Sequence, residues 1–242
     1  MTQQTEYTNY MSNQDSDTFV YNPPMEPFLE VLYEDTDIIV VNKPSGLLSV
    51  PGKAAEHNDS ILSRVRRDSP DAAAVHRLDM STSGILVVAK NKTAAGRLGK
   101  QFQERKTHKT YFAWVGGVVE QDEGVVNKPL CVDWLNRPLQ RVDYVNGREA
   151  ITNYTCLKRE NDRTLVKLQP ITGRSHQLRV HMMVLGHPIL GDHLYAPPEL
   201  RDMVPHLQLH AGYLSFYHPV TNELMEFTTL PPFDIPDDVK LF

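Results

Sequence analysis

Apolar residues in this chain are concentrated in short runs that are rich in β-branched and aromatic side chains and are bounded by Gly, Pro, Asn and Asp. Runs of this kind predict β-strands, because a few alternating or continuous apolar positions fit a pleated sheet with one or both faces buried. The sequence therefore predicts many short strands, at 29–33, 38–41, 85–88, 110–115, 125–126, 141–145, 150–157, 164–168, 207–216 and 223–228.

Helices are predicted in only three places, at about 60–67, 93–105 and 172–185. Each begins at residues that favour the N-cap position: Asp59 or Ser60, Asn91 or Thr93, and Thr172 or Ser175. Because the helices are few and do not alternate with the strands, the expected fold class is α+β. We expect a mixed, largely antiparallel sheet flanked by a few helices.

Domain boundaries follow from composition. Residues 1–25 are polar and close with Pro23-Pro24, which predicts a disordered tail. Residues 26–232 are expected to form a single domain, and residues 233–242 an acidic C-terminal tail after Pro231-Pro232.

Charge is distributed unevenly along the chain, although the net charge is −5. Residues 1–42 hold eight acidic residues and no Lys or Arg, and residues 219–242 carry a net charge of −4. The middle of the chain is left with a net charge of +7 and all ten histidines. Such asymmetry indicates either a polyanionic partner or a solvated basic surface between acidic ends.

Several classes of protein are disfavoured. No apolar run approaches the roughly 20 residues of a membrane span, and the N-terminus has no signal-peptide pattern, so we expect no membrane association. Cys131 and Cys156 are too few and too far apart to indicate a disulfide framework or a zinc site, which suits a reducing cytoplasm.

Common catalytic signatures are also missing. The chain has no Gly-x-Gly-x-x-Gly, no Walker motif, no His-Glu-x-x-His and no Gly-x-Ser-x-Gly. His176 and His181 are five positions apart, so on a helix they diverge by roughly 140°. A metal-dependent hydrolase stays open as an alternative, but no metal site is predicted.

One carboxylate stands out. Asp79 lies between an apolar-flanked segment and the turn Ser81-Thr82-Ser83-Gly84, directly before the strand predicted at 85–88. Rigid scaffolds present reactive side chains at such junctions, although Arg77 and Asp79 could equally form a structural ion pair. Farther along, Arg174, His176 and Arg179 cluster at a predicted helix start, which suits either phosphate or solvent.

The stretch His76-Arg77-Leu78-Asp79-x-x-Thr82-Ser83-Gly84 resembles the RluA family of pseudouridine synthases. The same order of motifs is completed by Asn42-Lys43-Pro44-Ser45-Gly46, Lys109-x-Tyr111-x-Ala113, the stretch 172–181 and the stretch 186–192. The resemblance spans about 42–210 and is greatest to dual-specificity members that lack an S4 RNA-binding domain. It implies the catalytic fold of that family, with the active site in a central cleft.

The resemblance also implies residue roles. Asp79 is the expected catalytic carboxylate, acting as a nucleophile or as a base on the ribose in a pocket that excludes water. Arg179 is expected to pair with it, and Arg77 to fill the gap left when the target base flips. Tyr111 is expected to stack on that base and to help remove its C5 proton. Basic residues expected to bind RNA are Lys43, Arg64, Arg67, Arg97, Lys100, Arg105, Lys109, Arg174 and His176.

The implied reaction breaks the N1–C1′ bond of uridine and joins C5 to C1′, so it needs no cofactor or metal. The implied partners are stem-loops, namely a hairpin of 23S rRNA and the anticodon arm of certain tRNAs. We expect a cytoplasmic monomer. A non-catalytic RNA-binding module is the second alternative, beside the metal-dependent RNA hydrolase.

Overall fold

The computed structural model describes residues 20–242 of the chain, so most of the predicted N-terminal tail lies outside the described residues. Its strands are β1 (Glu30–Glu34), β2 (Ile38–Lys43), β3 (Ala73–Ala74), β4 (Ser83–Ala89), β5 (His108–Gly116), β6 (Glu123–Asn127), β7 (Leu130–Val132), β8 (Gln140–Val142), β9 (Ile151–Arg159), β10 (Arg163–Pro170), β11 (Leu209–Tyr217) and β12 (Leu224–Thr228). Its helices are the 3₁₀ turn η2 (Ala55–His57), α2 (Ile61–Val65), α3 (Lys92–Gln103), α4 (Gln177–Val184) and α5 (Pro198–Arg201).

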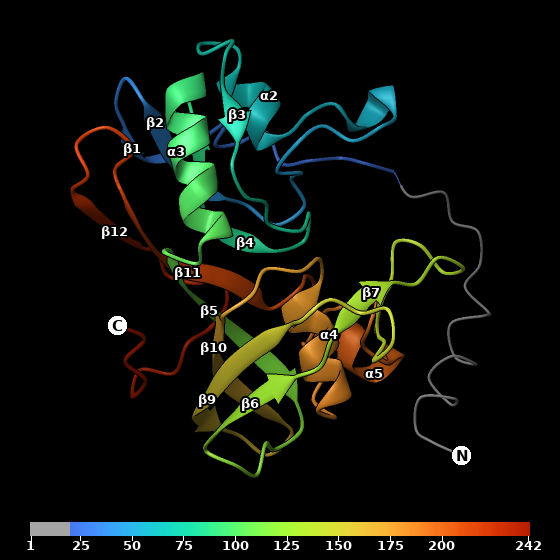
Figure 1. The fold of residues 1–242 in the computed structure, drawn as a ribbon. Helices are drawn as coiled ribbons and strands as arrows, with labels where there is room; N and C mark the ends of the chain where they lie inside the picture. The colour runs from blue at the N-terminus through green and yellow to red at the C-terminus, as the bar shows by residue number, and fades with distance from the viewer. Residues whose placement is uncertain (1–19) are drawn as a thin grey trace.

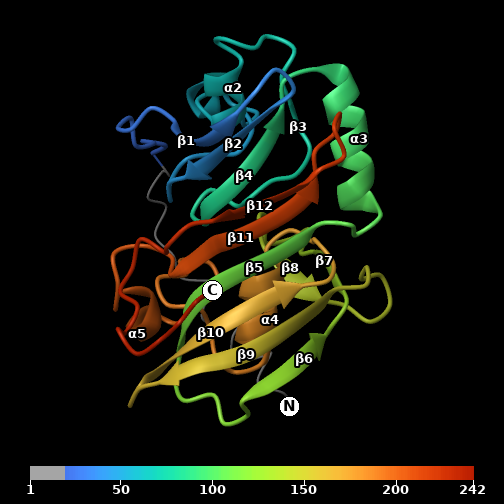
Figure 2. The same cartoon turned by 90° about the vertical axis from the view of Figure 1, so that its left-hand side faces the viewer.

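A ten-stranded sheet runs through the whole molecule (Figures 1 and 2). Its order is β1-β2-β4-β11-β5-β10-β9-β6, with β12 beside β11 and β3 beside β4. Within residues 20–242, β4 and β11 form the one parallel pair, and the other pairings are antiparallel. The predicted α+β class with a mixed, largely antiparallel sheet is confirmed.

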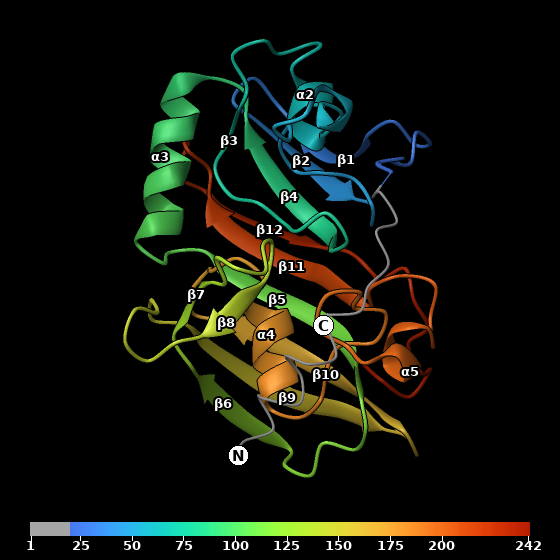
Figure 3. The ribbon, with the colours of Figure 1, turned by 90° about the vertical axis from the view of Figure 1, so that its right-hand side faces the viewer.

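The parallel pair joins an N-terminal half of the sheet to a C-terminal half. In the N-terminal half, α2 packs on one face, beside Val41 and Leu86, and α3 packs on the other, beside Val40 and Val87. In the C-terminal half, α4 covers one face of β5 and β10 (Figure 3). Strand residues of opposite parity therefore feed separate cores, as the pleat of a sheet requires.

The predicted start of α4 is wrong. The helix begins at Gln177, and neither Thr172 nor Ser175 caps it, because His176 at its N-cap is left-handed with φ 53°. The Thr172 hydroxyl instead donates to Oε1 of Gln177. At α2 the prediction holds, since Ser60 forms a capping box with Ser63.

Both ends of the described chain pack against the domain. The Tyr21 hydroxyl donates to the Asp59 carbonyl and accepts from the Leu48 amide. At the other end, the Trp114 indole donates to the Asp234 carbonyl, and Phe242 meets Phe112 edge to face. None of the described helices is long and apolar enough to span a bilayer.

Candidate active site

Asp79 lies in the loop between β3 and β4, and its neighbours in sequence are held on both sides. The amide and carbonyl of Leu78 both bond the Ser49 hydroxyl. The Met80 carbonyl accepts from the Lys43 ammonium at 2.9 Å and from the Gly46 amide. The loop is therefore fixed to the segment that follows β2, and the Asp79 side chain starts from a defined position. In Figure 3 the end of β4 at which the strand begins lies nearer the half of the molecule that carries α4.

Arg179 of α4 connects Asp79 to a second carboxylate. Its Nη1 lies 3.5 Å from Oδ2 of Asp79, whereas its Nε and Nη2 contact the two oxygens of Asp192 at 2.8 and 2.6 Å. The side chains of Arg179 and Asp192 are 4% and 0% exposed, against 28% for Asp79. Burial lowers the pKa of Arg179, but the hydrogen bonds and charge of Asp192, with the charge of Asp79, raise it overall, so the guanidinium stays charged.

Two tyrosines complete the surroundings of Asp79. Tyr111 of β5 packs where the cores of the two halves meet, and burial together with the charge of Asp79 raises its pKa, so the phenol is neutral near pH 7. The Tyr195 ring lies 5.1 Å from the guanidinium carbon of Arg179. Its hydroxyl accepts from the Gln140 amide and lies 2.6 Å from Nδ1 of His176.

The structure thus brings together Asp79, Tyr111 and Arg179 from three separate elements, and it places Arg77 on the exposed side of the same loop. Sequence reasoning missed Asp192 and Tyr195 as site residues. The available signal was the run Ile189-Leu190-Gly191-Asp192, in which a lone acid follows apolar residues directly and so requires a buried partner.

Lys43 does not lie where an RNA-binding residue must lie. It is fully buried, and its ammonium donates to the carbonyls of Pro44, Leu47 and Met80 at 2.9, 2.7 and 2.9 Å. Burial lowers the pKa of Lys43 to about 7, although the charge of Asp79 opposes the shift. The prediction that Lys43 contacts RNA is contradicted, because its charge is already satisfied by the protein.

Arg64 is a second correction. We expected it to bind RNA, but it is 1% exposed and holds Asp59 through Nε and Nη2 at 2.9 and 2.6 Å. It also donates to the carbonyls of Phe28 and Pro24. Arg67, by contrast, is exposed and stacks its guanidinium 4.3 Å above the Phe28 ring.

The other predicted RNA-binding residues lie in three places. Lys109, Arg174 and His176 are half-buried, and burial lowers the pKa of both Lys109 and His176. Of the three, His176 is close enough to the active site for the charge of Asp79 to oppose that shift. Arg105 is exposed just after α3 and forms an ion pair with Glu149 at 2.6 Å. The backbone carbonyl of Glu149 also accepts a hydrogen bond from Nε of Arg174.

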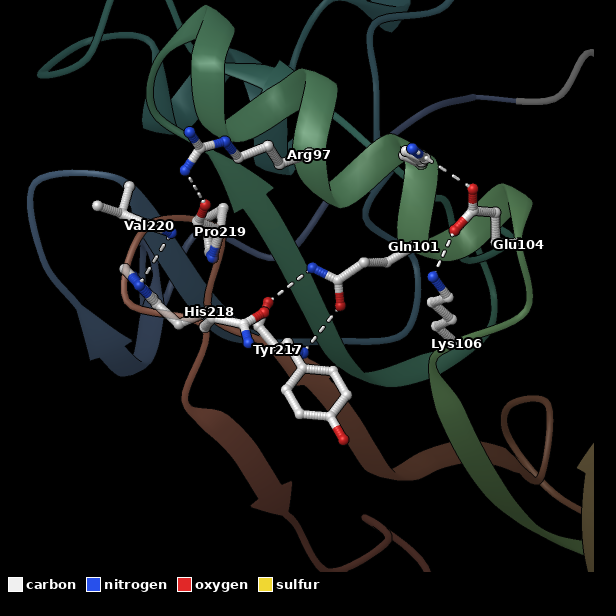
Figure 4. A pocket seen from close by; sticks show the side chains of 10 residues that line it. Arg97, Gln101, Glu104, Lys106, Tyr217, His218, Pro219 and Val220 are labelled. Carbon is white, nitrogen blue, oxygen red and sulfur yellow. Dashed lines mark hydrogen bonds and ion pairs between the residues drawn. The ribbon is translucent and has the colours of Figure 1, made fainter.

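Arg97 and Lys100 lie elsewhere. They line a surface groove of about 640 Å³ between α3 and the β11–β12 turn (Figure 4). Arg97 donates to the Pro219 carbonyl at 2.7 Å, and Lys100 lies 3.7 Å from Glu104. None of Asp79, Tyr111 and Arg179 lines this groove.

The two histidines considered for a metal site have separate partners. His176 contacts Tyr195, whereas His181 contacts the Thr152 hydroxyl and the Lys128 carbonyl. Among residues 20–242, the side chains close enough to share an ion are Asp35, Asp37 and His218, a group that contains no residue of the Asp79 site.

Comparison with known proteins identifies the family to which this fold belongs. The family model for RNA pseudouridylate synthases matches residues 37–183. The chain belongs to the RNA pseudouridylate synthase family, whose members isomerise uridine to pseudouridine in RNA.

Individual relatives are similar to this chain over most of its length. The dual-specificity RNA pseudouridine synthase RluA of Vibrio cholerae is 59% identical over 199 residues, which cover 82% of this chain and 81% of that protein. RluA of Escherichia coli K12 is 55% identical over 208 residues, covering 86% and 95% of the two chains. Among solved structures, human RNA pseudouridylate synthase domain containing 1 superposes with a TM-score of 0.71 at 31% identity, covering 89% and 86%.

Proposed function

We propose that this enzyme isomerises uridines in stem-loops of 23S rRNA and of tRNA, with Asp79 as the catalytic carboxylate. The observation that carries the proposal is the pairing of a partly exposed Asp79 with Arg179, whose other edge is fixed by buried Asp192. The dual-specificity names of the RluA relatives support two classes of RNA substrate. Monomeric action and a cytoplasmic location belong to the same proposal.

The reaction requires an ionised carboxylate beside the sugar. Asp79 acts either as a nucleophile toward the sugar or base, or as a base that removes the proton from C2′ of the ribose. In both routes the N1–C1′ bond breaks, the C5–C1′ bond forms, the C5 proton leaves and N1 takes up a proton, so the composition of the nucleotide does not change. In either route the Arg179 guanidinium, 3.5 Å away, supplies the positive charge beside this carboxylate.

Tyr111 has two roles in this proposal. Burial and the charge of Asp79 raise its pKa, so the ring is neutral at pH 7 and can stack on uracil. Its hydroxyl is the group that would help to remove the C5 proton.

The target uridine must leave its stack to reach Asp79. Arg77 is exposed two residues before Asp79, and we assign it to the space that the base vacates. Arg67, Lys109, Arg174 and His176 would hold phosphates around it, which predicts binding that weakens as salt increases.

The test is Asp79→Asn assayed by tritium release from stem-loop RNA labelled at uracil C5. The substitution keeps the shape of the side chain, so we expect RNA binding and the circular dichroism spectrum to persist while release falls by at least about 1,000-fold. Release near the wild-type rate would refute the role of Asp79.

The wild-type protein separates the alternatives in the same assay. A non-catalytic RNA-binding module would release no tritium, and a metal-dependent hydrolase would shorten the RNA and lose activity with a chelator. We expect release with no change of RNA length and no effect of chelator.

A further inference from the structure

An arm formed by residues 130–145 projects beside α4, outside the main sheet. It contains β7 and β8, which pair only with each other among the described strands (Figures 1 and 3). Its root is fixed: Leu130 packs with Val180 and Tyr195, and the Gln140 amide donates to the Tyr195 hydroxyl. Because Tyr195 lies against Arg179, the arm is anchored on the residues that surround Asp79.

The outer part of the arm exposes large apolar side chains. Trp134, Leu135, Tyr144 and Val145 are 72%, 93%, 70% and 90% exposed. Side chains of this size normally contribute to a core, and several gathered on one projection mark an interaction site. By contrast, Trp114 in the sheet is 1% exposed.

Cations accompany both aromatic rings. The Arg137 guanidinium lies 3.6 Å above the Trp134 ring, and the Lys128 ammonium lies 5.5 Å from the Tyr144 ring centre and donates to its hydroxyl. The arm also holds two carboxylates. That of Asp143 accepts from two backbone amides and pairs with Arg141 at 3.2 Å, and that of Asp133 accepts from the Asn136 side-chain amide. Arg137, and Lys128 just before the arm, are therefore the cations that lie beside the two exposed rings.

Aromatic rings beside cations suit unpaired nucleic-acid bases, because a base stacks on the ring while its phosphate meets the cation. Nucleic acid is the favoured ligand because the arm belongs to the middle of the chain, which carries a net charge of +7, and because it is anchored on Tyr195 beside Arg179. We propose that Trp134 stacks on an unpaired base of the RNA stem-loop, so that the arm recognises the loop away from the reacting uridine. This inference rests on the function proposed above and concerns affinity for RNA, not the chemical step.

The chain supplies its own reporter for this contact. It has two tryptophans, and since Trp114 is buried, acrylamide-accessible fluorescence comes from Trp134. We expect stem-loop RNA to quench this emission and to protect it from acrylamide. The same stem closed by a polyethylene glycol linker, with no loop bases, should do so far less. Unchanged Trp134 emission on adding stem-loop RNA overturns the proposal, as does a signal that depends on protein concentration alone, which would indicate self-association.

Variants give an independent readout by tritium release. Trp134→Ala should raise the KM for stem-loop RNA about tenfold, the loss of one stacked base, with kcat within twofold. Trp134→Phe keeps an aromatic face and should restore most of the affinity. The matched control is Leu224→Ala, which removes a side chain 54% exposed on β12 and should change neither constant.

An unchanged KM in Trp134→Ala would dismiss the arm while leaving the proposed function intact. An active Asp79→Asn enzyme would refute the catalytic assignment while leaving Trp134 quenching in place. The two failures are therefore distinguishable.

Discussion

Arg179 contacts two carboxylates, and their different exposure separates their roles. Asp192 is fully buried and bidentate, so it orients the guanidinium, whereas Asp79 has one longer contact and stays open to a substrate. We expect Asp192→Asn to lower the free energy of unfolding by about 3–5 kcal/mol in urea titrations, because it leaves a buried cation short of charge. The control Asp122→Asn breaks an exposed pair with Arg159 and should cost less than about 1 kcal/mol. Equal effects in the two variants would contradict this account.

Tyr111→Phe tests the role of the phenol. The variant keeps the ring but loses the hydroxyl, so RNA affinity should stay within about twofold while tritium release slows by roughly 100-fold or more. Release at the wild-type rate would rule out a part for the hydroxyl in removing the C5 proton. The comparison is Tyr217→Phe, which alters a tyrosine 42% exposed in the groove beside α3 and should leave both quantities unchanged. If Tyr111→Phe loses RNA affinity instead, the ring is not what holds the base.

At single positions, sequence reasoning fails where burial depends on distant segments. Lys43 and Arg64 have the charge of RNA-binding residues, yet loops and N-terminal carbonyls enclose both. Asp79, Tyr111 and Arg179 were predictable as a set only through the family resemblance, since they lie on three separate elements. Asp192 requires the fold, because nothing near it in sequence specifies its partner Arg179.

Elements were predictable wherever the pattern is local. The β-branched run before Ala89 forms β4, and α3 follows the Asn91 cap as expected. The start of α4 was not predictable. Thr172 and Ser175 were the expected N-cap residues, whereas His176 occupies that position in a left-handed conformation. Strand order was not predictable either, since β4 and β11 pair across more than a hundred residues of chain.

Gly84 is the residue on which that long-range pairing depends. Its φ is +116°, and an added Cβ would lie 2.3 Å from the Ala211 carbonyl oxygen on β11. Gly84→Ala should therefore force the strands apart and lower the free energy of unfolding by at least about 3 kcal/mol. Gly99→Ala is the matched control: nothing lies within 4 Å of its Cβ, and helix propensity should make α3 more stable by about 0.5–1 kcal/mol. Urea titration of both variants gives the comparison, and equal stabilities would show that β4 and β11 tolerate separation.

At the scale of the whole molecule, the C-terminal residues complete a core. Phe233, Ile235 and Val239 pack against the cluster that contains Trp114. Removing residues 233–242 should lower the free energy of unfolding by about 2–4 kcal/mol and shift the Trp114 emission to longer wavelength, since half-buried apolar area is lost. Lys158→Ala removes the ion pair with Asp238 but keeps the apolar contacts, so it should leave that emission unchanged. A truncated chain as stable as the intact one would show a free tail, as composition alone suggested.

Stability against acid depends on a histidine that ties distant parts of the sheet together. His210 of β11 contacts the Ser83 hydroxyl at the start of β4 and the Thr229 hydroxyl after β12, each at 2.9 Å. Burial lowers its pKa to about 4. Between the unfolded value of about 6.5 and pH 4, the unfolded chain binds a proton that the folded chain refuses, so stability falls as pH falls. Titration of this histidine alone should lower the free energy of unfolding by about 2 kcal/mol between pH 6.5 and pH 5, at about 1.4 kcal/mol for each pH unit.

His210→Gln removes that titration. The variant should be less stable than wild type at pH 7.5, because the amide replaces the two hydroxyl contacts imperfectly, but it should lose about 2 kcal/mol less on going to pH 5. Urea titrations at both pH values measure the difference, in which contributions from all other groups cancel. His193→Gln, at an exposed position, should follow the wild-type pH dependence. Parallel curves for His210→Gln and wild type would show that acid sensitivity arises at other buried groups.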